Sequence, residues 1–229
     1  MNTTETPRQP HEAILEQLDR RLPLWGPQLV VLGAILLDLA LPQRVTVGPF
    51  WLMPALEGLL LLGLMIASPN PRVRHSRARR TIGIGLTGLV SATNIASLVL
   101  LSHELLTGGV RNGRPLIVAG MLLWVTNVLL FGLWYWELDR GGPLARALGQ
   151  DRPPDFLYPQ MTNPDCAPVD WKPGLVDYLY TSFTNATAFS PTDTMPLTAT
   201  AKWLMTVQSL TALVTLGLVI ARAVNILQS

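Results

Sequence analysis

The chain has 229 residues, of which 49% are hydrophobic and only 14% are charged, and its formal net charge is +2. A soluble domain usually carries about a quarter charged residues, and here the shortfall lies in long runs with almost no charge. Such runs are typical of membrane-spanning helices and exclude an ordinary soluble domain.

The first 23 residues form a polar segment that mixes acidic and basic side chains. This segment lacks the basic-then-apolar layout of a cleavable signal peptide, so we expect none. Five apolar segments follow, and each is close to the 17–25 residues that a helix needs to cross a bilayer. Because backbone in lipid must satisfy its own hydrogen bonds, we expect all five to be helices. They cover about residues 24–41, 51–68, 81–106, 115–136 and 199–224.

Two stretches separate the fourth and fifth apolar segments. Residues 137–174 are rich in Pro, Gly and Asp, which predicts an irregular extramembrane surface loop. Residues 175–188, LVDYLYTSFTNATA, are apolar, aromatic and rich in hydroxyls, yet too short and too polar to span. We therefore interpret 175–188 as a re-entrant half-helix, which is tolerated at membrane depth only where protein or a water-filled cavity surrounds it.

Residues 177–225 contain an ordered set of features. An aromatic half-helix is followed by a threonine-rich turn, an aspartate, a proline and a long apolar helix with an internal glycine. This order resembles the two-helix pore-loop module of the potassium-channel superfamily. The matching residues are Leu179, Tyr180, Ser182 and Phe183 for the pore helix, Asp193, Pro196 and Thr198 after the filter, and Gly217, Leu218, Val219 and Ala221 for the inner helix.

The resemblance implies an all-α membrane protein with about five transmembrane helices and a pore half-helix, assembled as a homotetramer. Residues 24–106 would form a three-helix scaffold, and residues 107–229 would form the channel-like module. Within that module we expect an outer helix at 115–136, the extramembrane loop at 137–174, the pore helix at 175–188, a filter-like loop at 189–198 and an inner helix at 199–225.

The filter departs from the family pattern. The family has Thr-Val-Gly-Tyr-Gly-Asp, whose glycines reach the backbone angles that stack carbonyl oxygens toward the axis. Here Ser190 and Thr192 stand at the glycine positions, and Pro191 fixes its own backbone and lacks an N–H. We therefore expect a degenerate, glycine-free filter lined by hydroxyl and carboxylate rings, or an apolar constriction at Phe189. The candidate pore-lining residues are Thr187, Ala188, Phe189, Ser190, Pro191, Thr192 and Asp193.

Further residues are expected to support this pore. A half-helix whose C-terminus points at the pore centre favours cations there through its dipole. We expect Tyr180, Ser182, Thr184 and Asn185 to support the pore helix, and Gly217 to be a flexible point in the inner helix.

Four polar residues lie inside the predicted spans: Asp38, Glu57, Asn94 and Asn127. Intramembrane carboxylates are costly, so Asp38 and Glu57 are either functional, or reach the interface, or pair with an arginine. For Asn94 and Asn127 we favour hydrogen bonds between helices.

Motifs of enzymes and of metal or cofactor sites are absent from the sequence. There is no phosphate-binding glycine loop, no His-Glu-x-x-His and no Gly-x-Ser-x-Gly, and the three histidines and Cys166 lack metal-ligand spacing. We expect no enzyme activity, no metal and no cofactor. The arginine run at 72–80 is expected to touch anionic lipid head groups and not nucleic acid. The expected partners are inorganic ions, membrane lipids and further copies of the chain.

The distribution of positive charge conflicts with an external pore loop. With five crossings, 12 of the 17 Lys and Arg residues lie on the side that holds the 69–80 loop and residues 137–198. The positive-inside rule makes that side cytoplasmic, whereas most pore-loop channels hold the filter outside. Either the pore is inverted, or one apolar segment does not cross, or 175–191 crosses fully.

Three functional hypotheses follow. The first is a tetrameric channel in the cell membrane that passes monovalent cations without strong potassium selectivity. The second is a non-conducting membrane scaffold that kept the pore fold. The third is a small proton- or ion-coupled carrier that uses Asp38 or Glu57.

Overall fold

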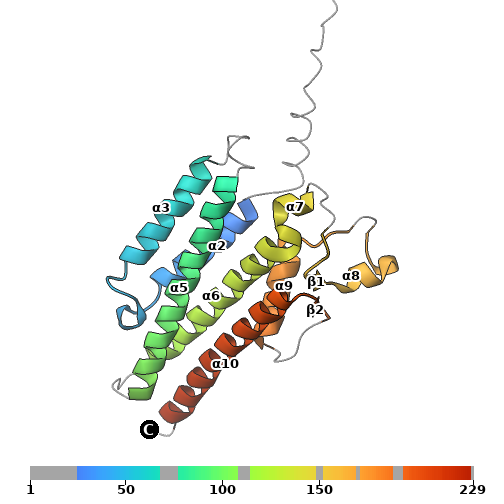
Figure 1. Ribbon diagram of the computed structural model, residues 1–229. Helices are drawn as coiled ribbons and strands as arrows, with labels where there is room; N and C mark the ends of the chain where they lie inside the picture. Colours follow the sequence, from blue (N-terminus) through green and yellow to red (C-terminus); the bar gives the residue numbers. More distant parts are fainter. Residues whose placement is uncertain are drawn as a thin grey trace, which may run out of the picture.

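Long apolar helices dominate the computed structural model, which describes residues 25–67, 77–107, 114–147, 152–168, 171–187 and 193–227 (Figure 1). The helices are α2 (Trp25–Leu39), α3 (Leu52–Ala67), α5 (Arg77–Thr107), α6 (Arg114–Leu138), α7 (Pro143–Ala147), α8 (Pro159–Thr162), α9 (Leu175–Thr187) and α10 (Ala199–Leu227). Short 3-10 helices lie at Gln43–Val45, Asp139–Gly141 and Pro164–Cys166. Two strands of two residues, β1 (Phe156–Leu157) and β2 (Met195–Pro196), pair antiparallel.

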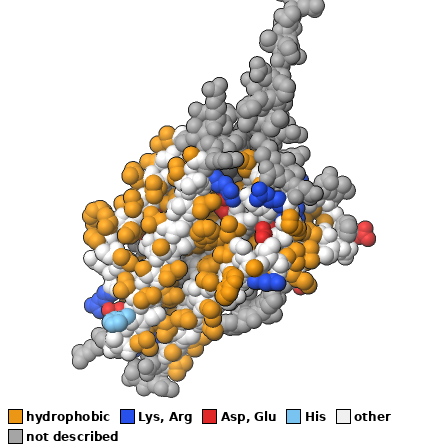
Figure 2. Space-filling view, viewed as in Figure 1, with side chains coloured by type: hydrophobic (Ala, Val, Ile, Leu, Met, Phe, Trp, Pro, Cys, Tyr) orange, Lys and Arg blue, Asp and Glu red, His pale blue; other side chains and the backbone are white. Residues whose placement is uncertain are grey.

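Among the described residues, three helices are long and apolar enough to cross a membrane, namely α5, α6 and α10. The other two predicted spans, α2 and α3, have 15 and 16 residues. At 1.5 Å per residue these cover only about 22–24 Å, less than the roughly 30 Å of hydrocarbon in a bilayer. The all-α class is confirmed, and the three long apolar helices suggest a multi-pass membrane protein. Figure 2 agrees with it, because charged side chains gather toward the two ends of the bundle and hydrophobic ones cover the band between.

Helix α6 is the central helix of the bundle. It packs against α2, α5, α9 and α10, and its second half has buried residues on all sides, whereas Val118, Met121 and Val125 of its first half are exposed. A helix that is apolar all round is expected to be buried. Two apolar clusters join α6 to the helices beside it. The first cluster is Val31, Ala34, Ile35, Leu61, Leu64, Leu86, Val90, Leu130 and Leu133, and the second cluster is Leu41, Val45, Leu98, Leu101, Leu116, Ala119 and Leu123.

Helix α9 runs antiparallel to α6 from one end of the bundle to about its middle. At the α9 N-terminus, Asp177 accepts a hydrogen bond from the Gly174 N–H at 2.7 Å, which stabilises the first turn. Further along, the Ser182 hydroxyl donates to the Val128 carbonyl at 2.7 Å. Near its end, Ala186 packs with Val128. Because Val128 lies near the middle of α6, α9 ends at mid-depth in the bundle.

After α9 the chain returns toward the end from which α9 started. The Thr181 hydroxyl, in the middle of α9, lies 3.5 Å from that of Thr194. β2 then pairs with β1, and α10 starts just after it and runs back down the bundle (Figure 1). α9 and α10 therefore begin at the same end of the bundle.

Glycines in α6 allow this close packing. A Cβ on Gly132 would lie 2.6 Å from Leu179 Cδ2 and 3.1 Å from Leu179 Cα, so α9 approaches α6 backbone to backbone. Such small-residue contacts are a common way for membrane helices to associate. A Cβ on Gly85 of α5, in contrast, would have no atom within 4 Å.

We expect Gly132→Ala to destabilise the chain by about 1–3 kcal/mol, because the added methyl group forces α9 away from α6. Gly85→Ala is the matched control and is expected to be neutral or slightly stabilising, since Ala has the higher helix propensity. Thermal unfolding of both purified variants in detergent measures the difference. Equal unfolding temperatures for the two variants would contradict the close approach of α9 to α6.

The segment 137–174 differs from the predicted irregular surface loop. Within its described part, Asp139, Phe156 and Tyr158 are buried, and the segment folds as short helices and a strand that pack on α6 and α9. An aromatic run at the end of a membrane helix is typical of a belt facing the interface, but here Tyr135 and Trp136 are buried in the cluster with Phe156 and Tyr178. The aromatic groups come together from several segments, so local sequence does not reveal the contact.

Candidate functional site

A buried polar network holds α9 between α6 and α10. We call it the α9 network, and its members are Tyr135, Ser182, Asn185, Gln208 and Ser209. The Gln208 amide nitrogen donates to both the carbonyl and the hydroxyl of Ser182, at 2.9 and 2.6 Å. The Gln208 amide oxygen accepts from Tyr135 and, at 2.8 Å, from Asn185. Gln208 is fully buried, and its side-chain amide has partners at both of its ends.

Asn185 extends the network along α10. Its amide nitrogen also donates to the Met205 carbonyl at 3.0 Å, and its amide oxygen accepts from the Ser209 hydroxyl at 3.1 Å. Networks whose members are all paired specify one arrangement, because any shift leaves a buried polar group unpaired. The α9 network therefore fixes the position and rotation of the second half of α9.

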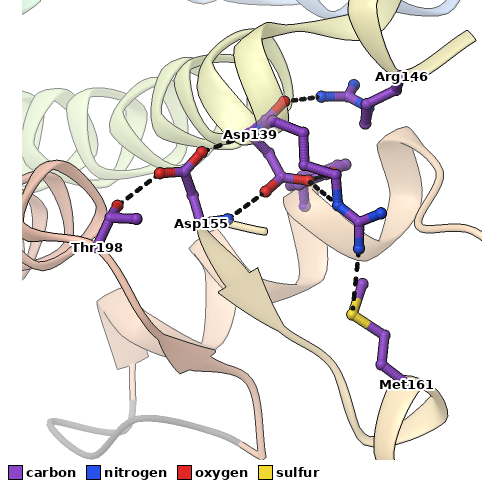
Figure 3. A network of polar contacts seen from close by, with 7 residues as sticks. Asp139, Arg146, Asp155, Met161 and Thr198 are labelled. Atoms are coloured by element: carbon purple, nitrogen blue, oxygen red, sulfur yellow. Dashed lines mark hydrogen bonds and ion pairs between the residues drawn. The ribbon is translucent and has the colours of Figure 1, made fainter. Parts of the chain in front are cut away.

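A second network holds the first half of α9 and centres on Asp139 (Figure 3). Asp139 is fully buried at the end of α6. One of its carboxylate oxygens accepts from the Tyr178 hydroxyl at 2.6 Å, and the other accepts from the Asp155 N–H at 2.8 Å. Its carbonyl accepts from Arg146 at 2.7 Å. Asp139 therefore joins α6 to α7, to α9 and to the segment that leads into β1.

Asp155 continues this network to the start of α10. Its carboxylate accepts from the Arg140 N–H at 2.9 Å and from the Thr198 hydroxyl at 2.5 Å. Thr198 in turn accepts from the Ala201 N–H at 3.3 Å, as an N-cap residue does. The first turn of α10 is thus tied to the end of α6 through two side chains (Figure 3).

The turn after α6 has an unusual backbone. Arg140, Gly141 and Gly142 have positive φ angles of 51°, 78° and 101°. Glycine adopts such angles without strain. At Gly142 a Cβ would also lie 2.6 Å from Arg80 Nη2. The strained Arg140 is held by its N–H bond to Asp155.

Arginines and aromatic rings surround this turn. The Arg146 guanidinium lies 5.7 Å from the Trp136 ring centroid and 5.3 Å from that of Tyr178. Arg80 contacts Glu137 at 3.5 Å. Burial raises the pKa of the nearby Tyr158 hydroxyl, so it stays protonated at neutral pH. The end of the bundle from which α9 enters therefore holds arginines that lie against aromatic rings and carboxylates.

The predicted pore-lining residues are described only in part. Ala188, Phe189, Ser190, Pro191 and Thr192 lie outside the described residues. Thr187 ends α9 and is exposed, and its hydroxyl donates to the Phe183 carbonyl at 2.9 Å. Asp193 is exposed. The two described members thus lie at the point where the chain turns back.

The predicted supporting residues of α9 divide into two faces. Ser182, Thr184 and Asn185 are buried, whereas Tyr180 is 61% exposed. Tyr180 shares its exposed face with Val176 (77%). Phe183, at 48%, continues this face one turn further along. Tyr180 therefore contributes to an open apolar face of α9 and not to its packing within one chain.

Helix α10 shows the same division. Its buried stripe is Ala201, Met205, Gln208, Ala212, Thr215 and Val219, and its exposed hydrophobic face is Trp203, Val207, Leu210, Leu213, Val214, Ile220 and Val224. α10 continues through Gly217 without a break, and a Cβ there would have no atom within 4 Å.

The four intramembrane polar residues have different surroundings. Asn94 donates to the Leu123 carbonyl of α6 at 3.3 Å, which is an interhelical hydrogen bond. The buried amide oxygen of Asn127 has no hydrogen-bond partner among the described residues. Both asparagines line a cavity of about 440 Å³ between α5, α6 and α10.

Asp38 and Glu57 are buried, and neither has an ion pair among the described residues. Of the alternatives for these two carboxylates, pairing with an arginine is therefore not found there.

Several residues of both networks were not singled out from the sequence. Tyr135, Asp139, Asp155 and Gln208 had been counted as parts of helices or loops. One signal that could have revealed Gln208 is its place on α10, because a glutamine inside a long apolar helix needs a buried partner. Within the described ranges, no group of three or more His, Cys, Asp or Glu could hold a metal ion.

Comparison with known proteins adds no relative: no family model, no curated protein and no solved structure matches this chain.

Proposed function

We propose that the chain is a subunit of a tetrameric cation channel of the cell membrane, in which α9 is a re-entrant pore helix and α10 lines the pore. The observation that carries the proposal is the path of the chain from α9 to α10. α9 runs from one end of the bundle to its middle. By Thr194 the chain is back beside Thr181, and α10 then begins at the end of the bundle where α9 began. A pore helix, a filter and an inner helix need this path.

The C-terminus of α9 supports cation passage. Helix C-termini carry a partial negative charge, which favours a cation in front of them. The α9 C-terminus lies at mid-depth, and the five residues that follow carry hydroxyls at Ser190 and Thr192 and lead to the Asp193 carboxylate. Rings of hydroxyl and carboxylate groups suit a partly hydrated cation, and a filter built from them is not expected to select strongly for potassium.

The exposed faces of α9 and α10 support assembly of several copies. Non-helical backbone at membrane depth must be covered by protein or face water. A single chain leaves α9 open along Val176, Tyr180 and Phe183. Four copies around an axis would cover this face with a neighbouring chain and give the turn after α9 a shared water-filled path.

In this proposal α2 and α3 also cross the membrane, which gives five crossings. Because both helices are short, they would stand nearly upright and the bilayer would be thinner around them. The end that holds Arg80, Arg140 and Arg146 would then be cytoplasmic, because the positive-inside rule counts Lys and Arg residues. The pore loop would enter from the cytoplasmic side, as an inverted pore.

The test is ion flux through the purified chain in liposomes under K⁺, Na⁺ and Cl⁻ gradients. We expect cation flux that falls by roughly ten-fold in Asp193→Asn, because four carboxylates no longer concentrate cations at the filter. Pro191→Gly should change the ratio of K⁺ to Na⁺ flux, since it frees the filter backbone.

The matched control is Asp165→Asn, the same substitution at an exposed residue on the Pro164–Cys166 helix. This variant should conduct as the parent chain does. If folded, tetrameric protein gives no flux under any gradient, the channel proposal is wrong and the non-conducting scaffold takes its place.

A further inference from the structure

A layer of polar side chains separates the two apolar clusters among α2, α3 and α5. On α5, Val90 belongs to the first cluster and Leu101 to the second. Thr93 and Ser97 lie between them on the same face, at the helical spacings of three and four residues. Both are buried, Thr93 at 7% exposure and Ser97 at 0%.

The same layer continues on α2 and α3. On α2, Asp38 follows Ile35 of the first cluster and precedes Leu41 of the second. On α3, Glu57 comes one turn before Leu61 of the first cluster. The Thr93 hydroxyl donates to Glu57 Oε1 at 3.2 Å, and Asp38 and Glu57 interact electrostatically. Asp38, Glu57 and Thr93 therefore form one buried cluster, and Ser97 follows Thr93 by one turn on the same face of α5. We call these four residues the polar layer.

No cationic side chain of the described residues neutralises the carboxylates of the polar layer. Glu57 is 0% exposed and Asp38 is 6% exposed. Glu57 Oε2 has no hydrogen-bond partner, and no Lys or Arg of the described residues forms an ion pair with either carboxylate. An unpaired buried carboxylate is strongly unfavourable, so this pair is neutralised either by protonation or by a bound cation.

Ser97 provides an independent indication of a ligand. Other buried or half-buried hydroxyls of α5 donate to the carbonyl four residues earlier, and these residues are Thr87, Ser91, Thr93 and Ser102. Ser97 Oγ makes no such bond and has no other partner among the described residues, although it is fully buried. A buried hydroxyl without a partner, one turn from the Thr93 that contacts Glu57, has the placement of a ligand oxygen.

We propose that the polar layer binds a small hard cation, Na⁺ or Ca²⁺, through oxygen atoms of Asp38, Glu57, Thr93 and Ser97. Hard cations prefer carboxylate and hydroxyl oxygens, and Ca²⁺ tolerates the flexible geometry of side chains from three helices. The layer offers no sulfur or imidazole ligand, so softer metals are disfavoured. This site lies in the three-helix part of the bundle, apart from the pore proposed at α9, and does not depend on conduction.

The experiment measures the unfolding temperature of the full chain in detergent while NaCl or CaCl₂ replaces choline chloride at constant ionic strength. We expect one of the two ions to raise the unfolding temperature by about 5 °C at saturation, because a ligand that binds only the folded state stabilises it. Binding of ²²Na⁺ or ⁴⁵Ca²⁺ to the same protein should identify which ion is held.

Ser97→Ala should abolish most of the shift and lower ion affinity ten-fold or more, and Glu57→Gln should abolish binding. Ser102→Ala is the matched control on the same helix, because its hydroxyl bonds its own backbone at Leu98. It should keep the full shift. The proposal is wrong if neither ion changes the unfolding temperature, if stability follows pH alone, or if Ser102→Ala and Ser97→Ala lose the shift equally.

Discussion

Replacing Gln208 by Leu is expected to lower the free energy of unfolding by about 2–4 kcal/mol. Leu has nearly the volume of Gln, so packing changes little. The substitution removes every hydrogen bond of the Gln208 amide and leaves Tyr135, Ser182 and Asn185 with buried groups short of a partner. An unpaired buried donor or acceptor is more unfavourable than a hydrogen bond is favourable, so the loss exceeds that of one bond.

Thermal unfolding in detergent measures this effect, and Trp fluorescence reports it because the chain has seven tryptophans. Thr206→Val is the control on the same helix, since Thr206 is exposed and its hydroxyl donates to the Lys202 carbonyl. The control should change stability by less than about 0.5 kcal/mol. If Gln208→Leu is as stable as this control, the α9 network does not hold α9 in place.

The long helices were predictable because their signal is strong over many residues. Segments predicted at 81–106, 115–136 and 199–224 are observed as Arg77–Thr107, Arg114–Leu138 and Ala199–Leu227. The helices extend beyond the apolar windows, because a helix continues through charged residues once it leaves the hydrocarbon. For α2 and α3 the observed bounds, Trp25–Leu39 and Leu52–Ala67, lie within two residues of the predicted 24–41 and 51–68, and both helices are shorter than α5, α6 and α10.

The half-helix was predicted at 175–188 and is observed as Leu175–Thr187. Its composition was informative, since hydroxyl and amide groups in an apolar stretch need partners in the bundle. The identity of those partners could not be predicted, because the sequence does not say which face of α10 meets α9. Gln208 belongs to a stripe with Met205 and Ala212 that becomes visible only once the helices are packed.

The segment after α6 was predicted least well. Pro, Gly and Asp favour turns, and acidic residues near a membrane surface are usually solvated. Asp139 and Asp155 are instead turned inward, because the backbone N–H groups and hydroxyls of other segments converge on them. No local pattern encodes such a convergence, since its donors are spread over about 60 residues of chain from Asp139 to Thr198.

Asp139 concentrates these interactions on one buried carboxylate. Tyr178 and the Asp155 N–H both donate to it, so each of its oxygens faces a donor. An asparagine in its place must turn its NH₂ group toward one of these donors. If the NH₂ group faces Tyr178, the hydroxyl can accept from it, but the Tyr178 O–H loses its carboxylate acceptor; if it faces the Asp155 N–H, two donors meet. Either way a charge-assisted hydrogen bond is lost in a buried site, which is unfavourable.

We therefore expect Asp139→Asn to destabilise the chain by about 2–4 kcal/mol and to loosen the start of α9, because Tyr178 loses its anchor. Asp165→Asn makes the same chemical change at an exposed residue and should be neutral. Thermal unfolding measures the first effect, and hydrogen exchange at residues 175–182 measures the second. Unchanged exchange in an otherwise destabilised variant would mean that α9 is held by the α9 network alone, whereas faster exchange would show that both networks are needed to position the half-helix.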